Sequence, residues 1–232
     1  MSKEEMIKQL QDQLSIAKLH RQSQGLNTSQ IAVKKEIKAF QVARLEQTHA
    51  DYLANKNTRS ALNFFLKEIY AGKDLEKRDE DLARFVDKMK KVFSTDTLDI
   101  ITRAVTLDAI TEELDNQMAV VLKPGFSQED YIKAYFEATT KAQREKQISL
   151  VESLGMTLSA KVKNPLLYGT LKLMRVPAAA ANLSHLQDFL EGGFQAFKET
   201  KDAKKFIEVL AARERQIITN VYTQKTHPFS VN

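Results

Sequence analysis

The sequence contains no cysteine, few glycines and prolines, and no long hydrophobic run. Without cysteine, the chain cannot form disulfides or use thiolates at a metal or redox site. No stretch approaches the ~18 apolar residues that a membrane-spanning helix needs. The N-terminal segment is charged and lacks the apolar core of a secretory signal. We therefore expect a cytoplasmic protein with no membrane span.

The scarcity of glycine and proline also bears on the fold class. Only 7 glycines and 4 prolines occur among 232 residues, while Ala, Leu, Lys, Glu and Gln are abundant. These residues lose little conformational entropy in a helix. Hydrophobic residues make up 43% of the chain and charged residues 28%, which is enough apolar material for a core. The composition predicts an all-α protein, a single compact domain of about eight or nine helices.

The net charge is +5, a small excess that is spread along the chain rather than concentrated. The densest basic stretch is Lys34-Lys35-Glu36-Ile37-Lys38, and Glu36 interrupts it. It lacks the interleaved aromatic residues of a platform for single-stranded nucleic acid. We interpret it as a solvated helix face, so the sequence disfavours nucleic acid as a partner.

Helical patterns separated by turn or capping signals cover nearly the whole chain. The clearest face begins at Leu82 and continues through Phe85, Val86 and Met89 at helical spacing. Gly155 is expected to end one helix, and Gly192-Gly193 marks either a break or a close approach between helices. Helices are predicted over residues 3–22, 28–54, 59–70, 73–93, 94–121, 127–154, 184–197 and 202–222, with short pieces near Pro165 and Pro177.

The helical pattern also suggests how the domain is organised. Residues 1–24 form an amphipathic helix with a narrow apolar stripe, which would bury little surface and could act as an arm. Residues 25–225 form the helical core domain. Residues 226–232 are expected to be a flexible tail.

An aromatic segment stands out at residues 64–70, which read Phe-Phe-Leu-Lys-Glu-Ile-Tyr. Its helix is too short to bury three large rings by itself. We expect Phe64, Phe65 and Tyr70 to anchor this helix in the core, and an aromatic ligand-binding box is the alternative.

This segment resembles the motif of the bacterial FFLEELY-motif proteins, with Lys67 in place of the first Glu and Ile69 in place of Leu. The resemblance covers most of the chain from about residue 40 onward. It includes segments at residues 48–51, 73–82, 174–178, 189–194 and 213–214. It implies a bacterial, cytosolic, helical protein, and it supplies no reaction, cofactor or catalytic residue.

Several apolar helix faces are interrupted by polar residues, whose burial is costly unless a partner compensates it. One of these polar residues is Asp108, and Glu112 and Asp115 follow it on the same side of the predicted helix. Two interpretations are open: an internal network that fixes how the helices pack, or a polar pocket between helices. The candidates for either are His49, Arg78, Asp79, Asp108, Arg213 and Glu214.

A metal site has only partial support from the sequence. Glu46 and His49 have the i, i+3 spacing of one half of a di-iron carboxylate site, but no other histidine has a glutamate three residues before it. No phosphate-binding loop, dinucleotide fingerprint or nucleophile elbow occurs. We therefore predict no metal site, and the sequence identifies no cofactor.

Two functional hypotheses follow from these observations. The first is a non-enzymatic binding or interaction protein that holds an unknown protein partner or small ligand in a groove between helices. A second copy of the chain is one such partner. The alternative is an enzyme with a polar site, with or without a metal, around His49, Asp108 and Glu214. This alternative requires the three side chains to converge in one cavity.

Overall fold

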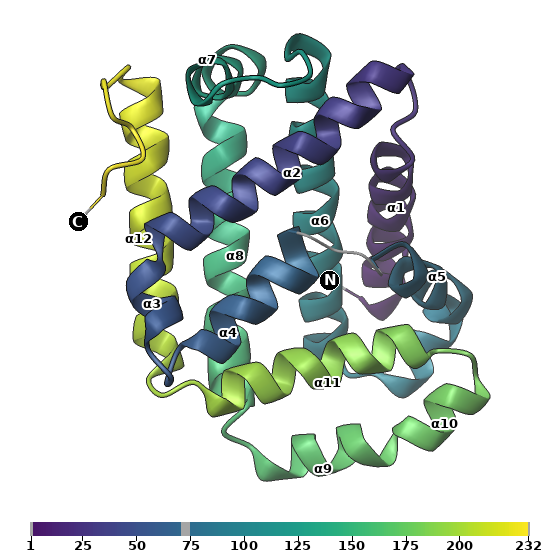
Figure 1. Ribbon diagram of the computed structural model, residues 1–232. Coiled ribbons are helices and arrows are strands. Elements are labelled where there is room, and N and C mark those ends of the chain that lie inside the picture. Colours follow the sequence, from purple (N-terminus) through teal and green to yellow (C-terminus); the bar gives the residue numbers. More distant parts are fainter. Residues whose placement is uncertain (1, 71–74, 232) are drawn as a thin grey trace.

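The computed structural model describes residues 2–70 and 75–231, which form helices joined by short turns in one compact chain (Figure 1). The described residues contain no strand, so the predicted all-α fold is confirmed. None of their helices is both long enough and apolar enough to cross a membrane. Four long helices pack side by side in a row, in the order α12 (Ala203–Tyr222), α8 (Lys141–Lys161), α6 (Thr95–Val121) and α1 (Lys3–Arg21).

The remaining helices cover this row. The longest of them, α2, crosses it diagonally and contacts α6 (Figure 1). Helix α5 packs beside α1, and α7 packs at the ends of α6 and α12. Helix α11 contacts α4, α5 and α8, while α9 and α10 pack on α11. These elements are α2 (Thr28–Thr48), α3 (Ala50–Ala54), α4 (Arg59–Phe64), the π-helical η1 (Phe65–Tyr70), α5 (Leu75–Val92), α7 (Gln128–Ala138), α9 (Pro165–Leu173), α10 (Arg175–Ala180) and α11 (Ser184–Glu199).

Side-chain caps explain several helix starts that the sequence predicts. The Ser94 hydroxyl accepts a hydrogen bond from the Thr97 amide at the start of α6. Ser127 and Asp130 form a capping box at the start of α7. Each cap provides a partner for amide groups that the first helical turn leaves free. These boundaries therefore follow from local chemistry.

Other boundaries were wrong, and the described chain has more helices than the eight or nine expected. The predicted helix over residues 28–54 is interrupted at His49, and the one over 59–70 changes from α to π geometry at Phe65. The helix predicted over 127–154 ends at Ala138, and α8 then runs straight through Gly155. The predicted start at Lys73 and Asp74 lies outside the described residues.

Gly155 allows two helices of the row to approach closely and does not end one. A Cβ atom at this position would lie 2.4 Å from Cδ1 and 2.7 Å from Cγ1 of Ile207 on α12. Such distances are far below ordinary van der Waals contact. The absence of a side chain at Gly155 therefore sets the close packing of α8 against α12.

The apolar core has three parts that follow the helix arrangement. One lies where α2, α7 and α12 meet around Tyr131. A second lies between α4, η1, α8, α11 and α12 around Phe206 and Phe197. The third joins α1, α5 and α6, and it contains the predicted face of α5. Its buried members are Ile7, Leu10, Leu14, Leu82, Val86, Met89, Leu98, Ile101, Val105 and Leu186.

The N-terminal helix α1, for which the sequence suggested an arm, lies against the other helices. Helix α1 packs along α6 and α5, where Leu10 and Ala17 are fully buried. Its narrow apolar stripe, Ile7, Leu10, Leu14 and Ala17, is buried along its whole length, and the first three residues belong to the third part of the core. The C-terminal residues are also attached. Asn220 donates a hydrogen bond of 3.0 Å to the Pro228 carbonyl.

The glycine pair at residues 192 and 193 lies inside α11 and marks a close approach to α4, one of the two expected interpretations. A Cβ at Gly193 would lie 2.9 Å from Cζ of Phe64, whereas one at Gly192 would lie 3.7 Å from the same ring. The first distance requires the ring to move, and the second is ordinary contact.

We expect opposite effects from the two alanine substitutions in this pair. Gly192→Ala should stabilise the fold by up to about 1 kcal/mol, because alanine favours the helix. Gly193→Ala should instead destabilise it by about 1–2 kcal/mol, because the added methyl group crowds Phe64. Chemical denaturation measures both, and Phe64→Leu should relieve the cost of Gly193→Ala. Equal effects of the two substitutions would contradict the close approach.

Candidate functional site

The six polar residues predicted from the helix faces fall into three groups. The first group bridges α5 and α6, the second lies between α2 and α12, and the third lies on the partly exposed flank of α12. In that order, the groups contain Arg78 with Asp79 and Asp108, His49 with Glu214, and Arg213.

The first group belongs to a larger salt-bridge network centred on Arg21, at the C-terminal end of α1. Nη2 of Arg21 lies 3.0 Å from Oδ2 of Asp79 and also contacts the Asp108 carboxylate. Nη1 of Arg21 lies 3.2 Å from Oε1 of Glu112. Nη2 of Arg78 lies 2.6 Å from Asp79 and 3.2 Å from Asp108. This Arg21 network joins α1, α2, α5 and α6, and it consists of Arg21, Lys34, Lys38, Arg78, Asp79, Asp108 and Glu112.

Glu112 is the most heavily shared carboxylate of the Arg21 network. It is almost completely buried and pairs with Lys34 at 2.7 Å, with Lys38 and with Arg21. Burial alone would raise the pKa of Glu112, but the Lys38 and Lys34 ammonium groups lower it to about 2. The carboxylate is therefore ionised at neutral pH, and it holds the positive charges of α1 and α2 against α6.

Two neighbouring carboxylates on α6 behave differently. Burial raises the pKa of Asp108, and Arg78 and Arg21 oppose this effect only in part. Burial also raises the pKa of Asp115, whose Oδ1 accepts a hydrogen bond of 2.9 Å from Gln41. One helix thus carries acids of opposite pKa shift within two turns, and their different partners cause the difference.

The second group is smaller and lies between α2 and α12. Nη1 of Arg44 lies 2.6 Å from both carboxylate oxygens of Glu214, and Nε2 of His49 lies 3.2 Å from Oε1. His49 is fully buried at the point where α2 gives way to α3. Burial would raise the pKa of Glu214, but Arg44 and His49 lower it to about 2. The contacts of Arg44 and His49 with Glu214 tie the end of α2 to α12, the last helix.

Arg213 stands apart from both groups. Its guanidinium forms hydrogen bonds of 2.8 and 2.9 Å with the exposed carboxylate of Asp51 and lies over the Tyr52 ring. The hydrogen bond from Arg213 lowers the pKa of Asp51. This pair secures α3 to the outside of α12.

The three residues of the enzyme hypothesis are only partly brought together. His49 contacts Glu214, but Asp108 pairs with Arg21 and Arg78. None of the three lines any of the three cavities described in this structure. Within the described residues, no group of three or more His, Cys, Asp or Glu side chains is arranged to hold a metal ion. Asp108 thus belongs to a different group of ion pairs from His49 and Glu214.

Sequence reasoning missed Arg21, Lys34 and Arg44, which supply positive charge to the two buried groups. The interpretation of residues 34–38 as a solvated face was wrong for Lys34, which is buried beneath α1 and donates to the His20 carbonyl at 2.7 Å. A signal existed, because Lys34 shares a helix face with the buried residues Ile37 and Gln41.

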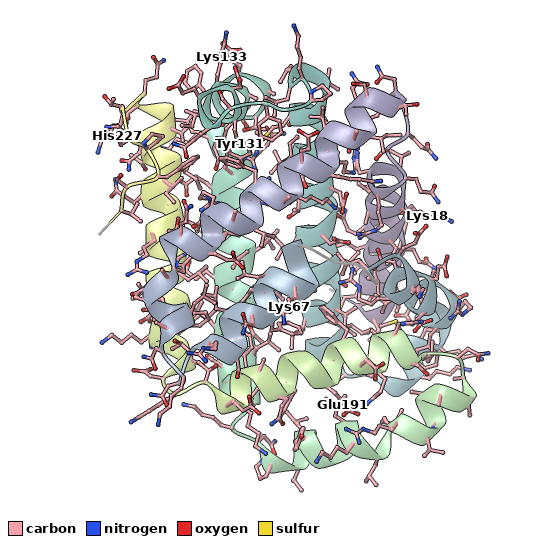
Figure 2. All side chains as sticks on the ribbon, viewed as in Figure 1. Lys18, Lys67, Tyr131, Lys133, Glu191 and His227 are labelled. Carbon is pink, nitrogen blue, oxygen red and sulfur yellow. The ribbon has the colours of Figure 1, made fainter. Side chains whose placement is uncertain are left out.

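An open groove between α1 and α5 reaches the Arg21 network from the surface. The two helices are antiparallel, since Gln11 donates to Asp87 at 3.0 Å while Arg21 pairs with Asp79. The groove has a volume of about 450 Å³, and Lys18 stands on its α1 side (Figure 2). Its lining residues are Gln11, Leu14, Ser15, Lys18, Arg21, Gln22, Glu76, Asp79, Glu80, Ala83, Val86 and Asp87.

A second cavity, of about 200 Å³, reaches the same network at Arg78 and is lined by one residue of the aromatic motif. Phe64 lines it, 5.5 Å from the ring of Phe189, and the Arg78 guanidinium lies 4.9 Å from the Phe189 ring. Phe65, in contrast, is buried against Phe197 in the core. The side chain of Tyr70 lies outside the described residues.

Comparison with known proteins places the chain in a family. No curated protein and no solved structure matches it. One family model, described as a domain of unknown function (DUF8198), matches residues 19–228, which include every residue of the Arg21 network and both helices of the second group. The match extends over most of the sequence, and the chain therefore belongs to the DUF8198 family.

Proposed function

We propose that the chain is a non-enzymatic binding protein and that the groove between α1 and α5 is its ligand site. The observation that carries this proposal is the position of the groove: it is an opening of small-molecule size directly above the buried Arg21 network. Its side walls are helices that the network holds in place. A preorganised site of this kind costs little entropy on binding.

The lining of the groove indicates the charge of its ligand. Glu76, Glu80 and Asp87 are exposed along one wall, and Lys18 is the exposed cation on the other. Arg21 and Asp79 at the floor are paired with each other, so the exposed charges of the groove are the three carboxylates of one wall and the single Lys18 of the other. The accessible charge is therefore negative, which favours a small polar cation.

Binding is favoured over catalysis by the chemistry of the groove. Its lining residues include carboxylates, amides, a hydroxyl and an ammonium group, but no histidine. The guanidinium of Arg21 already pairs with three carboxylates, so its role is to hold the helices together.

The proposal also includes kinship with the FFLEELY-motif proteins and a bacterial, cytoplasmic setting. Both rest on the motif at residues 64–70.

Isothermal titration with spermidine, a probe for a small polar cation, tests the groove. We expect saturable binding that the double substitution Glu76→Gln and Glu80→Gln weakens about tenfold, because two partly exposed ion pairs contribute up to about 1 kcal/mol each. Ala83→Leu, which fills the groove without burying a polar group, should abolish binding.

Matched controls lie on other helices of the fold. Glu129→Gln on α7 and Ala43→Leu on α2 change equally exposed residues and should bind the probe like the unaltered chain. If the unaltered chain releases no heat, or if all variants bind alike, the groove is not a cation site.

A further inference from the structure

The short helices α9 and α10 present an apolar face to solvent. Leu166, Leu173 and Val176 are 77%, 79% and 78% exposed, and α9 contains no buried residue. Leu166 and Leu173 are seven residues apart and lie on the same side of α9. Figure 1 shows both helices as the outermost layer, beyond α11. Large exposed apolar side chains gathered in this way are typical of an interaction surface.

The opposite side of these helices is fixed by specific contacts. The ring of Tyr168 stacks on Phe194 with centroids 5.2 Å apart. Gln187 donates to the Leu171 carbonyl at 2.6 Å, and Arg175 pairs with Glu191, which lies on α11 (Figure 2). Because these contacts orient α9 and α10, Leu166, Leu173 and Val176 are held outward.

The stretch of sequence that contains α9 and α10 carries charges of one sign. Residues 153–187 contain no aspartate or glutamate, although acids are interspersed with bases in the rest of the chain. The same stretch carries four basic residues, Lys161, Lys163, Lys172 and Arg175.

A basic cavity of about 320 Å³ lies at the base of α9. Three lysines line it, with two hydroxyl groups and a single carboxylate. Nζ of Lys198 lies 4.2 Å from the centre of the Tyr168 ring, which connects the cavity to α9. The charged lining residues are Lys163, Lys198, Lys204 and Asp202, and Lys204 is also 3.8 Å from Glu208.

We propose that the α9–α10 face docks on a membrane surface that contains anionic phospholipid. The exposed leucines and Val176 enter the interfacial layer, while the lysines of the cavity meet phosphate headgroups. Charge complementarity selects this occupant. A second copy of the chain, paired through the same face by two-fold symmetry, would place these basic groups near their own equivalents.

Vesicle co-sedimentation tests this proposal with the full chain. Vesicles of phosphatidylcholine and phosphatidylglycerol should bind the chain, whereas vesicles of phosphatidylcholine alone should bind it at least about tenfold less, since each lysine near an anionic surface contributes about 1 kcal/mol. The double substitution Leu166→Gln and Leu173→Gln should lower binding about tenfold or more, because it removes the apolar insertion. Lys163→Gln with Lys198→Gln should have a similar effect.

The controls replace exposed residues of the same kind elsewhere in the fold. Val120→Gln with Val121→Gln, on α6, and Lys88→Gln with Lys91→Gln, on α5, should leave vesicle binding unchanged. Thermal melting verifies that every variant is folded, as expected for exposed positions. Equal binding to neutral and anionic vesicles, or no effect of the leucine substitutions, would overturn the proposal. A dimer in ultracentrifugation that the leucine substitutions dissociate would also overturn it. The same holds if the chain binds glycerol phosphate but does not bind vesicles.

Discussion

A chain shortened to residues 25–232 is expected to lose its cooperative unfolding transition, because α1 completes both the core and the Arg21 network. Ile7, Leu10, Leu14 and Ala17 are buried against α5 and α6. Burying each large apolar side chain contributes about 1.5–3 kcal/mol, and their removal also exposes the core residues that face them. A domain of this kind is stable by only about 5–15 kcal/mol in total.

The truncation also removes a charge that the remaining helices need. Without Arg21, the carboxylates of Asp79, Asp108 and Glu112 lose a shared cation and stay close together at the surface of α5 and α6. Repulsion between like charges adds to the loss of apolar burial.

Circular dichroism during heating, together with gel filtration, measures this result. Ile16→Gln with Leu19→Gln is the matched control, because both side chains lie on the exposed side of α1. That variant should melt like the full chain. If the shortened chain keeps its transition temperature, α1 is a separable arm after all.

Replacing Glu112 by glutamine is the second change for which we expect a large effect. The amide keeps the size of the side chain but removes the negative charge that Lys34, Lys38 and Arg21 share. Lys34 is buried and would keep its hydrogen bond to the His20 carbonyl but lose its counter-ion. Breaking one side of a buried ion pair typically costs about 3–5 kcal/mol, so Glu112→Gln should lower the free energy of unfolding by that amount.

The same substitution should change how stability depends on pH. The pKa of Glu112 falls from its ordinary value of 4.5 to about 2 in the folded chain. Its contribution is therefore present above about pH 4.5 and is lost as the pH falls toward 2. Asp108 and Asp115, whose pKa values burial raises, act in the opposite direction, since their ionisation opposes folding at neutral pH.

Urea denaturation measured at about pH 7, 5 and 3 separates these effects. The free energy of unfolding should fall between pH 5 and 3, and Glu112→Gln should make this fall smaller without removing it. A remainder is expected because Glu214 also has a pKa of about 2. Glu129→Gln, at an exposed position on α7, should keep the full pH dependence. An unchanged pH dependence in Glu112→Gln would show that the buried pairing is not present in solution.

The fold class and many helix starts were predictable because both depend on local chemistry. Helical spacing identified the buried face of α5, and the Ser127 and Asp130 side chains identified the start of α7. Gly155 was misinterpreted because its role depends on Ile207, which lies more than fifty residues away in the sequence and on another helix. No local pattern distinguishes a glycine that ends a helix from one that admits a neighbour.

The candidate site was predictable only in part, for a related reason. Periodicity marked Asp108, Glu112 and Asp115 as one polar line on α6, but it could not show that α1 and α2 bring the cations. Lys34 appeared solvated because lysine usually is, and its burial depends on where α1 lies. The groove itself is formed by two helices separated by more than fifty residues, so it has no signature in the sequence.

The sharing of charges in the Arg21 network limits how the family can diverge at these positions. Asp79 and Asp108 each serve both Arg21 and Arg78, and Glu112 serves three cations. A single substitution anywhere in the network leaves a partner charged and buried. Substitutions that preserve the fold must therefore arise in compensating sets, so these positions should covary among relatives rather than drift independently.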